Sequence, residues 1–130
     1  MIYLVDTSWV VHYLRGKEDT MRMLLSLKKE GLAISIITLA ELYEGVFRAT
    51  NQTLAENRLE DFLSGTSILG VDEGICRIFG KEMARLHKEG KPIGDFDLLI
   101  ASTCLYHDLV LLTDNIKEFE RVEGLRLLKR

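Results

Sequence analysis

Ile2-Tyr3-Leu4-Val5-Asp6-Thr7-Ser8 is the stretch that decides the fold, because an apolar run passes into a carboxylate and then into two hydroxyl side chains. A short run that is apolar throughout is typical of a strand buried on both faces of a parallel sheet. Thr7 and Ser8 are favoured N-cap residues, and apolar side chains then recur at helical spacing up to Gly16. The stretch therefore predicts a strand that leads directly into a helix.

The rest of the chain repeats this order of apolar run and helical pattern. Short apolar runs predict further strands at Leu32–Ile37, Ser67–Val71, Leu109–Thr113 and Leu125–Leu128, the last at a sheet edge. The patterns between them predict helices, of which one is capped by Asp19 or Thr20 and another begins with a capping box at Thr38–Glu41. Further helices are predicted at Asn51–Ser64, between Asp72 and Gly90, at Leu98–Tyr106 and at Ile116–Arg121. A loop is predicted at Ile93–Asp97. Strands that alternate with helices predict an α/β fold with a parallel sheet covered on both faces. The 130 residues suit one domain, residues 1–130.

The composition is that of a soluble globular protein and excludes several other classes. Hydrophobic residues make up 47% and charged residues 28%. The net charge of −3 gives no general basic character, so a nucleic-acid partner would need a local basic face, for which the candidates are Arg15, Lys17, Arg22, Lys28, Lys29 and Arg48. There is no apolar run of about 18 residues and no signal-peptide pattern, so we expect a cytoplasmic protein without membrane contact.

The two cysteines, Cys76 and Cys104, show no spacing typical of a disulfide framework. This fits a reducing compartment. Cys104 and His107 are close enough in sequence to leave a zinc-binding pair open, although no second pair of ligands accompanies them.

Four acidic residues stand where strands end or helices begin. Asp6 and Asp114 directly follow predicted strands, Glu41 lies about one helical turn beyond another, and Asp97 precedes a helical pattern. Because ligands in open parallel sheets bind at the carboxyl ends of the strands, these side chains are expected to converge. Each also has an ordinary structural explanation, as a cap, a capping-box partner or a turn residue.

A cluster of unpaired carboxylates is unfavourable unless a cation neutralises it. Oxygen ligands without clustered histidine or cysteine suit Mg²⁺, or Mn²⁺, rather than zinc. Such an ion activates a water for attack and can stabilise a leaving oxygen. The four acids therefore favour metal-dependent hydrolysis of a phosphodiester bond.

Four motifs in the same order along the chain resemble those of the PIN-domain family, specifically its VapC-type toxin ribonucleases of type II toxin–antitoxin systems. They are Leu4-Val5-Asp6-Thr7-Ser8, Thr38-Leu39-Ala40-Glu41-Leu42, Gly94-Asp95-Phe96-Asp97-Leu98-Leu99-Ile100-Ala101 and Leu112-Thr113-Asp114-Asn115. The resemblance spans nearly the whole chain. It implies a three-layer α/β/α sandwich and a Mg²⁺-dependent endoribonuclease that forms homodimers and is inhibited by a cognate VapB-like antitoxin.

By the same resemblance, Asp6, Glu41 and Asp97 match the main metal-site acids, with Asp95 as a neighbour. The fourth position is open, because the family often places its last acid where this chain has Asn115, one residue after Asp114. Thr7 resembles the hydroxyl residue that orients the ligands, and Thr113 is a candidate for the same role.

Two other functions compete with this interpretation. A phosphoacceptor receiver domain also has a parallel α/β fold with an acidic Mg²⁺ pocket, and Asp72 could mimic its acceptor. However, Asp6 is followed by Thr7 rather than a second acid, and no lysine directly follows Thr113. A catalytically silent PIN scaffold is the second alternative, against which the intact acids argue.

Trp9 is expected in the core or at an interface, with stacking on an RNA base as the alternative.

Overall fold

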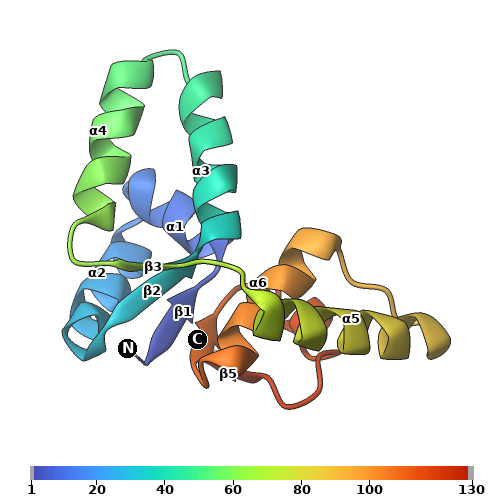
Figure 1. Ribbon diagram of the computed structural model, residues 1–130. Helices are drawn as coiled ribbons and strands as arrows, with labels where there is room; N and C mark the ends of the chain where they lie inside the picture. Colours follow the sequence, from blue (N-terminus) through green and yellow to red (C-terminus); the bar gives the residue numbers. More distant parts are fainter. Residues whose placement is uncertain (1, 129–130) are drawn as a thin grey trace.

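A parallel five-stranded sheet forms the centre of the computed structural model, which describes residues 2–128 (Figure 1). The strand order is β3-β2-β1-β4-β5, and every neighbouring pair is parallel. The strands are β1 (Tyr3–Val5), β2 (Leu32–Ser35), β3 (Ser67–Leu69), β4 (Val110–Leu112) and β5 (Arg126–Leu128). All five predicted strands are present, and β5 lies at an edge as expected.

Helices cover both faces of the sheet and complete the three-layer sandwich. One layer contains α1 (Thr7–Leu14), α2 (Glu18–Leu27) with a 3₁₀ turn at Lys28–Glu30, α3 (Ile36–Arg48) and α4 (Gln52–Leu63). The other contains α5 (Glu73–Lys88), α6 (Asp95–Tyr106) and the short α7 (Ile116–Phe119). Figure 1 shows α3 and α4 rising together as a pair away from α5 and α6.

Neighbouring residues of the central strands belong to two separate hydrophobic cores, one on each face of the sheet. Leu4 and Leu111 pack with α5, α6 and α7, whereas Val5 and Leu112 pack with α1 to α4. All four are completely buried. The strands are apolar on both sides because each side faces a helical layer, which confirms the reasoning from the opening stretch.

The register of β1 and β4 brings two predicted site segments together. Val5 pairs with Leu112, so the residues that follow, Asp6 and Thr113, leave the sheet side by side. The backbone N–H of Asp6 donates to the carbonyl of Leu112 at 2.9 Å. The sheet thus fixes the first acid beside the segment that carries Thr113, Asp114 and Asn115.

Several predicted helix starts are wrong, and that of α3 matters for the site. The strand predicted at Leu32–Ile37 ends at Ser35, whose hydroxyl accepts from the Ile37 N–H at 3.0 Å and caps α3. The capping box at Thr38–Glu41 therefore does not exist, and both residues lie inside the helix. Two consecutive β-branched isoleucines prolonged the strand pattern past its real end.

Three further starts differ from the predictions. Asp6 itself, rather than Thr7 or Ser8, is the N-cap of α1. Helix α2 begins at Glu18 after Lys17, before the predicted caps Asp19 and Thr20. Helix α6 begins at Asp95, so the loop predicted at Ile93–Asp97 extends only to its N-cap, Gly94. The predicted cap of α5 is confirmed, because Asp72 accepts from the Ile75 N–H at 3.0 Å.

Cys104 belongs to the core rather than to a zinc site. Its buried thiol donates to the carbonyl of Leu109 at 3.1 Å, and burial raises its pKa to about 12. The thiol is enclosed in the core, and among residues 2–128 no three His, Cys, Asp or Glu side chains are grouped so that they could hold a metal ion, so the structure gives no support to a zinc site at Cys104 and His107. Within residues 2–128, no helix has the length and apolar character needed to span a membrane.

Candidate metal site

The carboxylate of Asp6 lies between β1 and α1 and is buried. Its Oδ1 accepts from the Thr7 backbone N–H at 2.9 Å, and its Oδ2 accepts from the Thr113 hydroxyl at 2.7 Å and from the Ser8 hydroxyl at 3.4 Å. Burial raises the pKa of Asp6, and these hydrogen bonds only partly oppose the effect. Asp6 is therefore a positioned carboxylate whose negative charge is incompletely compensated.

Glu41 is held against α1 through the Thr7 hydroxyl. Thr7 Oγ1 lies 2.7 Å from Glu41 Oε1 and 3.0 Å from the hydroxyl oxygen of Thr38. A carboxylate only accepts hydrogen bonds, so the Thr7 proton is directed to Glu41. Thr38 is buried one helical turn before Glu41 on α3. The two threonines thus join the start of α1 to the acid of α3.

Asp97 reaches the same place from the opposite helical layer. It lies in the first turn of α6 and is half-buried. Its pKa is raised to about 6, first by burial and then by the charges of Asp6, Glu118 and Glu41. Asp97 is therefore close enough to Asp6 and Glu41, both distant in sequence, for their charges to disfavour its ionisation.

Glu118 is an acid of this cluster that the sequence patterns missed. It lies on α7, where Oε1 accepts from the Gly94 N–H at 3.1 Å and Oε2 accepts from the Asn115 side-chain amide at 2.8 Å. These bonds hold it beside the start of α6 and hence beside Asp97. Its signal in the sequence is an acid one helical turn after Asn115, in the first turn of a helix that follows a strand.

Asp114 and Asn115, the candidates for the fourth acid, both adjoin the cluster, since the charge of Asp114 acts on Asp6 and the Asn115 side-chain amide donates to Glu118. Asp114 Oδ1 accepts from the indole N–H of Trp9 at 3.0 Å, and its Oδ2 lies 3.5 Å from His12 Nδ1. The Asn115 N–H donates to the Thr113 hydroxyl oxygen at 3.0 Å. Asp95, on the first turn of α6, is exposed. Trp9 is completely buried, so the core interpretation is confirmed and base stacking by Trp9 is excluded.

The donor set suits a hard divalent cation. Every candidate donor is an oxygen, and the excess negative charge at Asp97 is of the kind that Mg²⁺ or Mn²⁺ relieves. Across the described part of the chain, no three His, Cys, Asp or Glu side chains are grouped closely enough to form a shell that could hold a metal ion. Mg²⁺ does not need such a shell, because it commonly uses one or two carboxylates and retains several waters. The carboxylates present therefore fit the ion.

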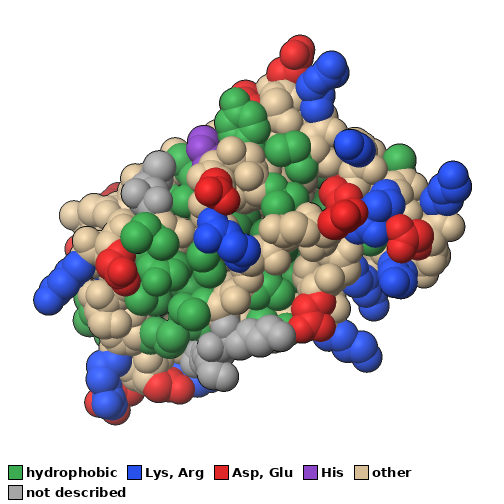
Figure 2. All heavy atoms as spheres, turned by 90° about the horizontal axis from the view of Figure 1, so that it is seen from below, with side chains coloured by type: hydrophobic (Ala, Val, Ile, Leu, Met, Phe, Trp, Pro, Cys, Tyr) green, Lys and Arg blue, Asp and Glu red, His purple; other side chains and the backbone are tan. Residues whose placement is uncertain are grey.

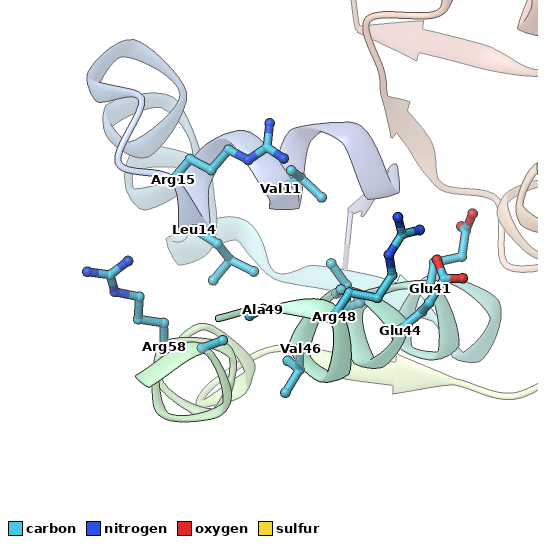
Figure 3. A pocket seen from close by; sticks show the side chains of 12 residues that line it. Val11, Leu14, Arg15, Glu41, Glu44, Val46, Arg48, Ala49 and Arg58 are labelled. Carbon is cyan, nitrogen blue, oxygen red and sulfur yellow. The ribbon is translucent and has the colours of Figure 1, made fainter. Parts of the chain in front are cut away.

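A groove of about 620 Å³ runs from the site along α1, α3 and α4. Its floor is apolar, and Figure 3 shows Glu41 and Glu44 at one end, Arg58 at the far end, and Arg15 and Arg48 on its rim. Arg15 and Arg48 belong to the predicted basic face. Arg22, another candidate for that face, is exposed and pairs with Glu18 at 3.3 Å. The groove thus places arginine side chains next to the acidic cluster.

Comparison with known proteins identifies the family. The PIN domain family model matches residues 3–125. Ribonuclease VapC1 of Haemophilus influenzae strain R2866 is 34% identical over 128 residues, covering 97% of this chain and 96% of that protein. The tRNA(fMet)-specific endonuclease VapC of Shigella flexneri is 32% identical over 127 residues, covering 95% and 94%. This chain belongs to the PIN-domain family, among its VapC-type toxin ribonucleases.

Solved structures agree with this assignment. VapBC2 of Rickettsia felis, crystallised bound to a DNA fragment from its promoter, superposes with a TM-score of 0.92 at 34% identity and covers 98% of both chains. The receiver-domain alternative is therefore wrong, and Asp72, its supposed acceptor, caps α5. The chain is a nuclease of the hydrolase class by family.

Proposed function

We propose that this protein is a Mg²⁺-dependent endoribonuclease, the toxin of a VapBC-type pair, which cleaves RNA at the cluster of Asp6, Glu41, Asp97 and Glu118. The observation that carries the proposal is the electrostatic contact of Asp97 with the other three acids across two helical layers. Neighbouring carboxylates whose charges raise the pKa of Asp97 are unfavourable unless a cation neutralises them or a reaction uses them. A catalytically silent scaffold has no use for this arrangement.

Each acid has a proposed role that follows from its hydrogen bonds and its position. Asp6, fixed by Thr7 and Thr113, and Asp97 hold the ion. When bound, Mg²⁺ would supply a nucleophilic water at neutral pH and positive charge for the transition state. Glu41, anchored by Thr7, orients the attacking water towards the phosphate. Glu118 completes the acidic set from α7, and Asp95 lies at its margin.

The groove beside Glu41 supports an RNA substrate and a protein inhibitor. Its arginines supply the local positive charge that a chain of net charge −3 otherwise lacks. Viewed from below, the molecule instead shows acidic and basic side chains interspersed around exposed hydrophobic ones (Figure 2). A VapB-like antitoxin is the proposed partner, since similar chains are crystallised as VapBC complexes. The homodimer stays a prediction.

Cleavage by purified protein tests the proposal directly. The wild type should cleave RNA in Mg²⁺ and lose activity in EDTA, and Asp6→Asn should lower kcat by about 10²-fold or more. Initiator tRNA is the first substrate to try, because one relative is a tRNA(fMet)-specific endonuclease. Equal cleavage by Asp6→Asn, or undiminished cleavage in EDTA, would show that the carboxylates are not a metal-nuclease site.

Glu118→Gln tests which acid is the fourth. The substitution keeps the acceptor for the Gly94 N–H but removes the charge that acts on Asp97. We expect kcat to fall by about 10-fold or more, as for loss of a group that supports a metal site. The matched control is Asp61→Asn on the exposed side of α4, which should retain wild-type activity. If Glu118→Gln is as active as this control, Glu118 has no part in the reaction.

A further inference from the structure

The side chain of Asp114 connects the end of β4 to one face of α1. Its Oδ1 accepts from Trp9 Nε1 at 3.0 Å, and its Oδ2 faces His12 Nδ1 at 3.5 Å. Trp9 and His12 are three residues apart on α1 and therefore lie on the same side of that helix. Both carboxylate oxygens of Asp114 are thus directed towards α1.

The hydrogen bond between Trp9 and Asp114 satisfies a buried donor. Trp9 is completely buried, and a buried indole N–H requires an acceptor. The acceptor here is a carboxylate, which makes the hydrogen bond charge-assisted and stronger than a neutral one. We call this pair the Trp9–Asp114 latch. The residues that it joins are 105 positions apart in the sequence.

Both ends of the latch lie next to the atoms that hold Asp6. Thr113, directly before Asp114, donates its hydroxyl to Asp6 Oδ2 at 2.7 Å. Asp6 caps α1, the helix that carries Trp9. The contacts therefore close a ring that runs from Asp6 through α1 to Trp9, across to Asp114, and back through Thr113 to Asp6.

We propose that Asp114 is a positioning residue rather than a metal ligand, and that the Trp9–Asp114 latch fixes the Thr113 hydroxyl and thereby the orientation of the Asp6 carboxylate. This inference rests on the proposed function, in which Asp6 holds the ion. It gives the acid after Thr113 a role and assigns the fourth acidic position of the cluster to Glu118.

Asp114→Asn and Asp114→Ala separate the two roles. Asparagine keeps an oxygen that can accept from Trp9 but lacks the charge of a ligand, whereas alanine removes both. The latch predicts that Asp114→Asn binds Mn²⁺ within about 3-fold of the wild type, while Asp114→Ala binds it about 10-fold to 100-fold more weakly, as outer-shell changes do. Titration calorimetry with Mn²⁺ on the full chain measures both. Asp61→Ala, an exposed aspartate on α4, is the control that should match the wild type.

A double-mutant cycle with Trp9→Phe tests the connection itself. If Trp9 and Asp114 act through one bond, Trp9→Phe should weaken Mn²⁺ binding in the wild-type background but add little in the Asp114→Ala background. Equal loss of affinity in Asp114→Asn and Asp114→Ala, or wild-type affinity in both, would overturn the proposal. The two Asp114 variants decide the matter even if Trp9→Phe fails to fold.

Nuclear magnetic resonance adds a readout that needs no metal. Trp9 is the only tryptophan, so the single indole N–H signal reports on the latch. Asp114→Ala should shift this signal together with the backbone N–H signals of Thr7 and Asn115, which donate to Asp6 and Thr113. Asp114→Asn should leave the Thr7 and Asn115 signals near their wild-type positions. Unmoved signals in Asp114→Ala would overturn the latch, whereas a wild type that binds no Mn²⁺ would overturn the proposed function alone.

Discussion

At the scale of the residue, the sequence indicated the central acids of the cluster but not all of their neighbours. Asp6, Glu41 and Asp97 could be named because each follows a strand or opens a helix, and a parallel sheet gathers such positions. Glu118 was missed because its place beside Asp97 depends on its bond to the Gly94 N–H, 24 positions away. The contact of Asp114 with Trp9 could not be foreseen for the same reason, because the two residues are 105 positions apart in the sequence.

The raised pKa of Asp97 predicts a pH effect on the metal-free protein. Its pKa is about 6 in the fold, whereas an aspartate exposed to water has a pKa of 3.8, so the folded state binds the proton more tightly. This group therefore favours the folded state at low pH, and its contribution is lost as pH rises from about 4 to about 6. Asp97→Asn should remove that dependence and raise the Tm of the EDTA-treated protein at neutral pH.

Thermal unfolding of the two proteins in EDTA across this pH range measures the effect. Because Asp97 is only half-buried, solvent screening reduces its size. The quantity to compare is the difference in Tm between wild type and Asp97→Asn at each pH, which cancels the titration of groups that do not interact with Asp97. A difference that stays constant with pH would contradict the raised pKa.

At the scale of the element, the strands and their order along the chain were predictable, whereas the starts of α1, α2, α3 and α6 were not. Apolar runs of three or four residues between helical patterns located every strand of the sheet. The start of α3 was misplaced because Ile36 and Ile37 continue an apolar run, while the cap that ends it, Ser35, is a single residue inside the predicted strand. Capping geometry is local and three-dimensional, so sequence spacing identifies it poorly.

The packing of α5 on α6 gives a prediction with opposite signs at two glycines of one helix. A Cβ at Gly74 would overlap the ring of Tyr106, with Cδ1 and Cζ at 3.1 Å, whereas a Cβ at Gly80 meets nothing within 4 Å. Gly80→Ala should stabilise the protein by about 0.5–1 kcal/mol, because alanine favours the helix. Gly74→Ala should instead destabilise it by about 1–3 kcal/mol through overpacking.

Urea unfolding at equilibrium measures both glycine variants, with Gly80→Ala as the matched control for helix propensity. Helix α6 carries Asp97 in its first turn, so displacement of α6 by the Gly74→Ala overlap should also weaken Mg²⁺ binding. Gly80→Ala should leave metal binding unchanged. A stabilised Gly74→Ala protein would mean that Tyr106 moves aside freely and that α5 and α6 do not fix each other's positions at this point.

At the scale of the whole molecule, the acidic cluster joins the two helical layers across the end of the sheet. Asp6 and Glu41 belong to the side of α1 and α3, and Asp97 and Glu118 to the side of α6 and α7. Without a cation, repulsion across this junction opposes the packing of the two layers. The site is therefore expected to limit the stability of the metal-free fold, although the central strands beneath it are buried and mostly apolar.

Mg²⁺ should accordingly raise the Tm of the wild type by mass action, since it binds the folded state. At a concentration about 100-fold above Kd, the expected stabilisation is about 2.7 kcal/mol. Asp6→Asn should be slightly more stable than the wild type in EDTA, because it removes one charge, and should respond less to Mg²⁺. NaCl at matched ionic strength is the control, because simple screening also weakens carboxylate repulsion. Equal Tm increases with NaCl and Mg²⁺ would mean that the acids repel one another without forming a cation site. In that case, calorimetric titration would show that Asp6→Asn binds Mg²⁺ no more weakly than the wild type does.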